Sequence, residues 1–135
     1  MARKKVLVVD DEEVIRKVVK ACLVKSNYKI KEAADGAQAL ETLDREDFDL
    51  VILDIIMPGK DGWQVLVDLR SNPKTKNMPV IVLSGKNEDA DMLKGYELGA
   101  SYYIAKPFTK AQLLYGLQLM FTKDSPATNY RTIPW

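Results

Sequence analysis

The segment LVILDIIM, residues 50–57, places one acidic residue, Asp54, inside an otherwise apolar stretch. Its first four residues form a continuous run of Leu, Val and Ile, which is typical of a strand buried on both faces of a parallel sheet. Asp54 follows that run directly, and apolar residues continue after it. A charge in such surroundings costs free energy unless it is compensated, so Asp54 needs a partner.

Further short apolar runs occur on both sides of this segment, and amphipathic stretches separate them. Tyr28–Ala34 begins by alternating apolar residues with Lys29 and Lys31, which predicts an edge strand blunted by lysine. Between the runs, apolar residues recur every three or four positions, as in helices. We therefore predict an α/β fold of five β-α units, with helices on both faces of one parallel sheet. The five predicted strands are Val6–Val9, Tyr28–Ala34, Leu50–Leu53, Val80–Leu83 and Tyr102–Ala105.

Helix start and stop signals support the intervening helices. Asp35, Asp61 and Thr109 each precede a glutamine by three residues, which resembles a capping box. Asn72-Pro73 ends the third predicted helix. Gly99 follows the fourth, where a left-handed cap is common.

The composition excludes several classes of function. Twenty basic and nineteen acidic residues give a net charge of +1, so the chain has no general attraction for nucleic acid or an anionic membrane. The absence of histidine excludes Ser-His triads and His metal ligands. The single cysteine, Cys22, lies among apolar residues, which indicates a core position, with a reactive thiol as the alternative. Neither a signal-peptide core nor a membrane-spanning run is present in the sequence, so we expect a cytoplasmic protein.

The periodic pattern stops near the C-terminal end of the sequence. We expect one domain at residues 1–122 and a tail or linker at residues 123–135. A disordered or loosely docked tail is one interpretation, and a specific contact by Tyr130 or Trp135 is the other. The tail is too short for a DNA-binding element, so we expect no direct contact with nucleic acid. The sequence fits either a stand-alone protein or a fragment of a longer chain.

Polar side chains follow four of the predicted strands. Asp10 and Asp11 follow the first strand, Asp54 the third and Ser84 the fourth, and Lys106 follows the fifth. In an open parallel sheet, ligands bind beyond the carboxyl ends of the strands. Each residue also has an ordinary structural interpretation: Asp11 could cap a helix, Ser84 could cap a turn, and Lys106 could be a solvated charge. Their coincidence at one edge favours a functional site.

The chemistry of these groups points to a metal and a phosphoryl group. Crowded carboxylates repel one another, and a divalent cation removes that repulsion. Oxygen ligands without histidine or a suitable cysteine argue against Zn²⁺ and match Mg²⁺. Lys106 adds positive charge for a phosphoryl group, and Ser84 adds a hydrogen-bond donor. These residues predict phosphoryl transfer with Asp54 as the nucleophile.

The chain resembles the receiver domain of two-component response regulators, and closely resembles the single-domain receivers of the chemotaxis type, over roughly residues 4–122. The resemblance rests on VLVVDD at residues 6–11, LDIIMPGKDG at 53–62, VLSG at 82–85 and KPF at 106–108. It implies a flavodoxin-like (βα)5 three-layer sandwich with strand order 2-1-3-4-5. It also implies a cis peptide bond between Lys106 and Pro107.

The resemblance further implies roles for the site residues. Mg²⁺ would be bound by Asp11 and Asp54, by Asp10 through water, and by the backbone carbonyl of Ile56. Asp54 would accept a phosphoryl group from a sensor histidine kinase or a phosphotransfer protein. The protein would then be a phosphoacceptor that assists only its own phosphorylation and dephosphorylation, and not an enzyme.

The resemblance also implies how the signal leaves the site. Ser84 would move toward the phosphoryl oxygen, and Tyr103 would turn inward; an ordinary surface tyrosine is the alternative for Tyr103. The changed face would be helix 4, strand 5 and helix 5, which would bind a downstream protein or a second copy. Tyr115 and Leu119 exceed the needs of one core-facing stripe, so they contact a partner or are covered by the tail.

Two residues near the site would tune autodephosphorylation, namely Ile56 and Lys86. Many members of the family carry a polar residue two positions after the phosphoacceptor, where this chain has Ile56. Because an apolar side chain cannot hydrogen-bond an attacking water, we expect slow autodephosphorylation.

Three other functions are alternatives for this sequence. A phosphatase of the haloacid dehalogenase type needs a second aspartate two residues after the nucleophile, where Ile56 stands. An FMN-binding flavodoxin needs a loop rich in glycine and hydroxyl groups after the first strand, whereas residues 10–13 are all acidic and would repel phosphate. An interaction module that does not use its phosphorylation site is the third alternative.

Overall fold

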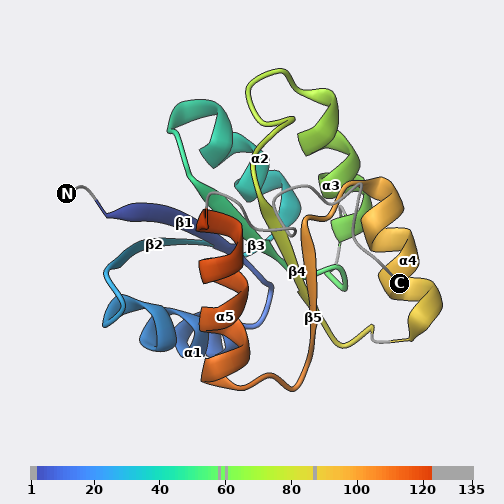
Figure 1. Ribbon diagram of the computed structural model, residues 1–135. Coiled ribbons are helices and arrows are strands. Elements are labelled where there is room, and N and C mark those ends of the chain that lie inside the picture. Colours follow the sequence, from blue (N-terminus) through green and yellow to red (C-terminus); the bar gives the residue numbers. More distant parts are fainter. Residues whose placement is uncertain (1–2, 58, 60, 87, 123–135) are drawn as a thin grey trace.

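The computed structural model contains one parallel five-stranded sheet with helices on both faces (Figure 1), and it describes residues 3–57, 59, 61–86 and 88–122. The strands are β1 (Lys4–Val9), β2 (Tyr28–Ala33), β3 (Leu50–Leu53), β4 (Val80–Ser84) and β5 (Tyr102–Ala105). The helices are α1 (Glu13–Val24), α2 (Gly36–Arg45), α3 (Gly62–Ser71), α4 (Asp89–Leu98) and α5 (Lys110–Phe121).

The strand order is β2-β1-β3-β4-β5, which confirms the predicted flavodoxin-like topology. The register aligns the carboxyl ends of the strands: Val9 pairs with Leu53, Leu53 with Val82, and Ser84 with Ala105. The residues that follow β1, β3, β4 and β5 therefore meet at one edge. The peptide bond between Lys106 and Pro107 is cis, as the resemblance implied.

Two apolar clusters form the core, one on each face of the sheet. Helices α1 and α5 cover one face, and α2, α3 and α4 cover the other (Figure 1). Leu23 and Leu117 on the first face are fully buried, and burying each such side chain contributes about 1.5–3 kcal/mol. Cys22 is partly buried and packs against the same cluster, so it lies beside the core and not fully within it.

The helix ends mostly follow the predicted signals. The side chains of Asp35, Asp61 and Thr109 each accept a hydrogen bond from the backbone of the glutamine three residues later. Helix α4 has a capping box that the sequence analysis missed, formed by Glu88 and Asp91. The N-cap residue of α1 is Glu12, so the interpretation of Asp11 as a helix cap is wrong.

Arg70 links three segments at the end of the sheet opposite Asp54. Gly99, which ends α4 in the predicted left-handed conformation (φ 111°), lies directly under the arginine side chain. A Cβ at Gly99 would lie 2.6 Å from Arg70 Cγ, so glycine is needed there for space as well as for backbone conformation. The guanidinium donates to the carbonyls of Gly99 (2.9 Å), Thr75 (3.3 Å), Lys76 (3.1 Å) and Met78 (2.6 Å) and to Ser101 Oγ (3.3 Å).

Other predictions concern the surface. Lys29 and Lys31 are exposed on β2, which is an edge strand as predicted. Tyr115 is 56% exposed, as expected of a side chain that the core does not need. Leu119 is partly buried and packs against the core, so it is not surplus to the core-facing stripe. Among the described residues, no helix is long and apolar enough to span a membrane. The predictions for the tail, including contacts of Tyr130 and Trp135, fall outside the described residues.

Candidate functional site

A lysine joins two buried carboxylates at the carboxyl edge of the sheet. The Lys106 ammonium donates to Asp10 Oδ2 at 2.8 Å and to Asp54 Oδ2 at 3.4 Å. Asp10 and Asp54 are only 2% and 4% exposed. The Lys106 side chain is 16% exposed, so its interpretation as a solvated charge is wrong. One ammonium group thus compensates two carboxylates that would otherwise be costly to bury.

Backbone groups hold the other carboxylate oxygens. Asp10 Oδ1 accepts from the amide of Glu12 at 2.9 Å, and Asp54 Oδ1 accepts from the amide of Ile56 at 3.1 Å. Helix α3 begins against this loop at Gly62, where a Cβ would lie 2.4 Å from Ile55 Cα. Glycine at this position therefore lets α3 pack against the backbone that follows Asp54.

Asp10 also belongs to a group of three acidic side chains at this edge of the sheet. Asp10, Asp11 and Glu12 offer carboxylate oxygens within 4.8 Å of one another, and the last two side chains are exposed. A set of hard oxygen donors with open access fits Mg²⁺, which keeps several waters when it binds carboxylates. Glu12 is not one of the predicted metal ligands, although the acidic run at residues 10–12 is a signal for it. Asp54 is linked to this group through Lys106, which also contacts Asp10.

Ser84 and Tyr103 meet at the backbone of Lys86. Ser84 is fully buried, and its hydroxyl accepts from the Lys86 amide at 3.2 Å, so it does cap a turn. The Tyr103 hydroxyl donates to the Lys86 carbonyl. Tyr103 is buried, so the alternative of a surface tyrosine is wrong. Its ring lies against Gly95 of α4, where a Cβ would be 2.9 Å from Tyr103 Cδ2. Tyr103 therefore points inward in this structure.

Ile56 and Lys86 border the site in different ways. Ile56 is 52% exposed, next to the buried Asp54 carboxylate. Lys86 is also exposed, and it contacts Ser84 and Tyr103 through its backbone amide and carbonyl. A side-chain pattern in the sequence could not have revealed this backbone role.

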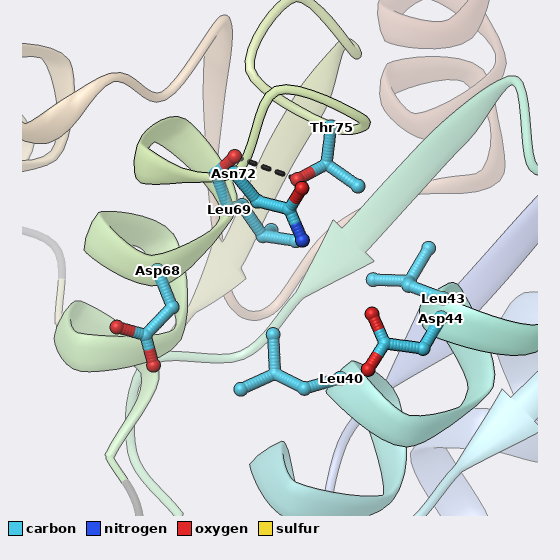
Figure 2. A pocket seen from close by; sticks show the side chains of 7 residues that line it. All are labelled: Leu40, Leu43, Asp44, Asp68, Leu69, Asn72 and Thr75. Carbon is cyan, nitrogen blue, oxygen red and sulfur yellow. Dashed lines mark hydrogen bonds between the residues drawn. The ribbon is translucent and has the colours of Figure 1, made fainter.

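A separate pocket lies between α2 and α3, at the opposite end of the sheet from Asp54. Figure 2 shows its lining residues, with Leu40 and Leu43 from α2 and Leu69 from α3. Its volume is about 200 Å³. The Thr75 hydroxyl donates to the Leu69 carbonyl at 2.7 Å, so this buried polar group already has a partner. The pocket contributes nothing to the edge that carries Asp54.

The sequence of this chain matches the model of a known protein family. The model of the response regulator receiver domain matches residues 6–118. The chain belongs to the response regulator receiver family. This receiver domain is 36% identical to a probable transcriptional regulator, ycf27, of Porphyridium aerugineum and 35% identical to the transcriptional regulatory protein ResD of Bacillus subtilis. The matches cover 99% and 93% of this chain but 55% and 51% of the relatives, so the chain spans about half their length.

Solved structures agree with this assignment. The chemotaxis protein CheY4 of Vibrio cholerae superposes on the receiver domain with a TM-score of 0.82 at 33% identity, covering 87% of this chain and 98% of that one. The receiver domain of the Francisella response regulator 1452 gives a TM-score of 0.81 at 30% identity, covering 87% and 96%. The receiver domain therefore has a CheY-like fold and takes part in two-component signalling.

The electrostatics of the receiver domain set the protonation of its central groups. Burial raises the pKa of Asp54, the charge of Lys106 opposes this rise, and the charge of Asp10 adds to it. Burial alone would lower the pKa of Lys106, but the two carboxylates outweigh burial and raise it. Burial, together with the charge of Asp91, raises the pKa of Tyr103 to about 12, so its hydroxyl keeps the proton that it donates.

We predict that Asp54→Asn stabilises the metal-free receiver domain increasingly as pH rises. A pKa that is higher in the folded state means that the contribution of Asp54 is fully present below the ordinary value of 3.8 and is lost as pH rises through the folded value. Asparagine carries no charge and does not lose this contribution. Urea unfolding in the presence of a chelator, from below pH 3.8 up to pH 7, measures the difference in free energy of unfolding between Asp54→Asn and the wild type. The exposed Asp44→Asn serves as the control, and an advantage of Asp54→Asn that shrinks as pH rises contradicts the prediction.

Proposed function

We propose that this receiver domain is a phosphorylation switch whose phosphoacceptor is Asp54. The donor is a phosphohistidine on a sensor kinase or a phosphotransfer protein. An Asp54 carboxylate oxygen forms the new bond to phosphorus, the phosphorus–nitrogen bond breaks, and the leaving imidazole takes up a proton. The observation that supports this proposal most strongly is the Lys106 bridge between Asp10 and Asp54 at the carboxyl edge of the sheet.

The surrounding residues have distinct proposed roles. Asp10, Asp11 and Asp54, with the backbone carbonyl of Ile56, are the groups proposed to hold Mg²⁺. When bound, Mg²⁺ would offset negative charge on the phosphoryl oxygens. The Lys106 ammonium is already fixed beside Asp54, so it can pair with a phosphoryl oxygen without a large rearrangement.

The proposed output begins at Ser84. Its hydroxyl would turn from the Lys86 amide to a phosphoryl oxygen, which changes the turn that also anchors Tyr103. The face formed by α4, β5 and α5 is then proposed to bind a downstream protein or a second copy, and Leu93 and Tyr115 are exposed apolar side chains on it. A free-energy coupling of about 1–3 kcal/mol is enough for such a switch.

The setting of the switch is proposed to be cytoplasmic. Two relatives are named transcriptional regulators and are about twice as long as this chain. For residues 3–122 we propose protein partners and no direct contact with nucleic acid, in keeping with a net charge of +1 for the whole sequence.

A phosphatase function of the haloacid dehalogenase type is disfavoured, because Ile56 occupies the place of its general acid.

Phosphorylation by a small-molecule donor tests this proposal. The purified protein is incubated with acetyl phosphate and Mg²⁺, and its intact mass is measured. We expect an increase of one phosphoryl group that needs Mg²⁺, is lost in Asp54→Ala and persists in Asp44→Ala, a variant of an exposed aspartate on α2. No adduct in the wild type, or an undiminished adduct in Asp54→Ala, overturns the proposal.

We predict that Ile56→Asn speeds the loss of phosphate from Asp54. An amide in place of the exposed isoleucine can hydrogen-bond the attacking water, and one such bond of about 1 kcal/mol corresponds to roughly a fivefold increase in rate. The decay of the phosphorylated mass after removal of acetyl phosphate measures this rate. Ile56→Val keeps an apolar side chain and is the control. An unchanged rate in Ile56→Asn contradicts the prediction.

A further inference from the structure

The side chain of Arg16, on the first turns of α1, contacts the main chain of the acidic loop. Its Nη1 donates to the Asp10 carbonyl at 2.8 Å, and its Nε donates to Glu32 Oε1 at 3.1 Å. The Arg16 side chain is largely buried, and the side chain of Glu32 is partly buried. The planar guanidinium thus bonds the Asp10 carbonyl and the Glu32 carboxylate through two different nitrogens. A lysine at this position has only one nitrogen and cannot reach both acceptors in the same way.

These contacts complete the fixing of Asp10. Its amide donates to the Ala33 carbonyl at 3.2 Å, and its two carboxylate oxygens accept from Glu12 and Lys106. Arg16 binds the remaining polar group of Asp10, its carbonyl oxygen. Glu32 lies on β2 opposite Val8 of β1, so the anchor of Arg16 belongs to the rigid sheet. Arg16 therefore ties the carbonyl of Asp10, which leads into Asp11 and Glu12, to the sheet.

We propose that Arg16 is a positioning residue for the cation site, which it serves by fixing the backbone between Asp10 and Glu12 in the orientation that brings their carboxylates together. This inference rests on the proposed function, because the cation is the Mg²⁺ of phosphoryl transfer. Residues that orient metal ligands typically change metal affinity about 10–100-fold when they are replaced.

Charge and position act in opposite directions here, which makes the proposal testable. Arg16 is a cation close to an acidic group, so removing its charge alone would raise Mg²⁺ affinity. Removing its hydrogen bonds would lower the affinity, because the carboxylates would no longer be held together. Arg16→Lys keeps the charge and loses the planar fork, so it isolates the positioning effect.

Calorimetric titration with MgCl₂, without any phosphoryl donor, measures this effect. We expect about tenfold weaker binding in Arg16→Lys and weaker binding also in Arg16→Met. Lys17→Met, which removes an exposed cation from the same helix, is the matched control, and we expect its affinity to be unchanged or slightly higher. In the Arg16→Lys background, Glu32→Gln should add little, because the two residues act as one unit. Wild-type affinity in Arg16→Lys, or tighter binding in Arg16→Met, overturns the proposal.

A measurement without metal separates this proposal from the proposed function. Amide hydrogen exchange of Glu12, whose amide donates to Asp10 Oδ1, reports directly on the loop. We expect faster exchange at Glu12 in Arg16→Lys than in the wild type, with unchanged exchange in the central strand β3. Unchanged exchange at Glu12 overturns the positioning role even if Asp54 is phosphorylated normally. The exchange at Glu12 could instead be faster in Arg16→Lys while the wild-type protein never accepts a phosphoryl group. That result supports the positioning role of Arg16 and contradicts only the proposed function.

Discussion

Lys106→Met is expected to lower the free energy of unfolding by about 3 kcal/mol at pH 7 without Mg²⁺, because removing one partner leaves buried charge uncompensated. Methionine keeps the length of the side chain, so the loss reports the charge and not the packing. Asp10 and Asp54 would then be two buried carboxylates that share no cation. Urea unfolding monitored by circular dichroism measures the change.

The pH dependence of this loss identifies its cause. A protonated carboxyl group needs no cation, and burial raises the pKa of Asp54. The deficit of Lys106→Met should therefore shrink as the pH is lowered and Asp54 takes up a proton. The matched control is Lys20→Met, which removes an exposed lysine of α1 and should change stability by no more than about 0.5 kcal/mol. A deficit below about 1 kcal/mol at pH 7, or one of equal size at pH 4, would show that the lysine does not compensate these charges.

Arg70→Met is expected to have an effect of similar size at the other end of the sheet. The substitution removes donors to the carbonyls of Thr75, Met78 and Gly99, and each buried carbonyl left without a partner costs about 1–3 kcal/mol. Because water can reach part of this region, we expect a total loss of about 3 kcal/mol and a melting temperature about 10 °C lower. Differential scanning calorimetry measures both quantities.

Two comparisons make the Arg70 prediction specific. Arg45→Met removes an exposed arginine that pairs with Glu41 on the same helix, and such a pair contributes about 0.3–0.5 kcal/mol. Arg70→Lys keeps the charge but cannot reach carbonyls in several directions, so it should recover less than half of the loss. Full stability in Arg70→Lys would mean that charge, and not the network of hydrogen bonds, is what Arg70 contributes.

The fold and the positions of the main site residues could be predicted because their signals are local. Apolar runs mark the strands, and Asp54 and Lys106 directly follow two of them. In a parallel sheet, residues that follow the strands must meet at one edge. The edge position of β2 could be predicted from its alternation of apolar residues with Lys29 and Lys31, because both lysines would be buried in a central strand.

The features that the sequence did not reveal depend on contacts between distant segments. The partners of Arg16 and Arg70 are largely backbone carbonyls, which every residue carries, so no side-chain pattern marks them. The inward position of Tyr103 depends on Gly95 of the neighbouring helix α4, because a Cβ at Gly95 would clash with the tyrosine ring. The contact of Leu119 with the core is not predictable from a one-dimensional helix pattern, because that pattern does not show how far the core extends around α5.

The two edges of the sheet bear on how other proteins could recognise this domain. On β2, exposed Lys29 and Lys31 oppose the addition of a strand from another chain, and β5 at the other edge is only four residues long. Strand addition relies on main-chain hydrogen bonds, which are the same in every protein and therefore discriminate poorly. Under the proposed function, partners would instead contact helix side chains, which differ between otherwise similar domains, and the sheet would thereby favour the separation of one signalling route from another.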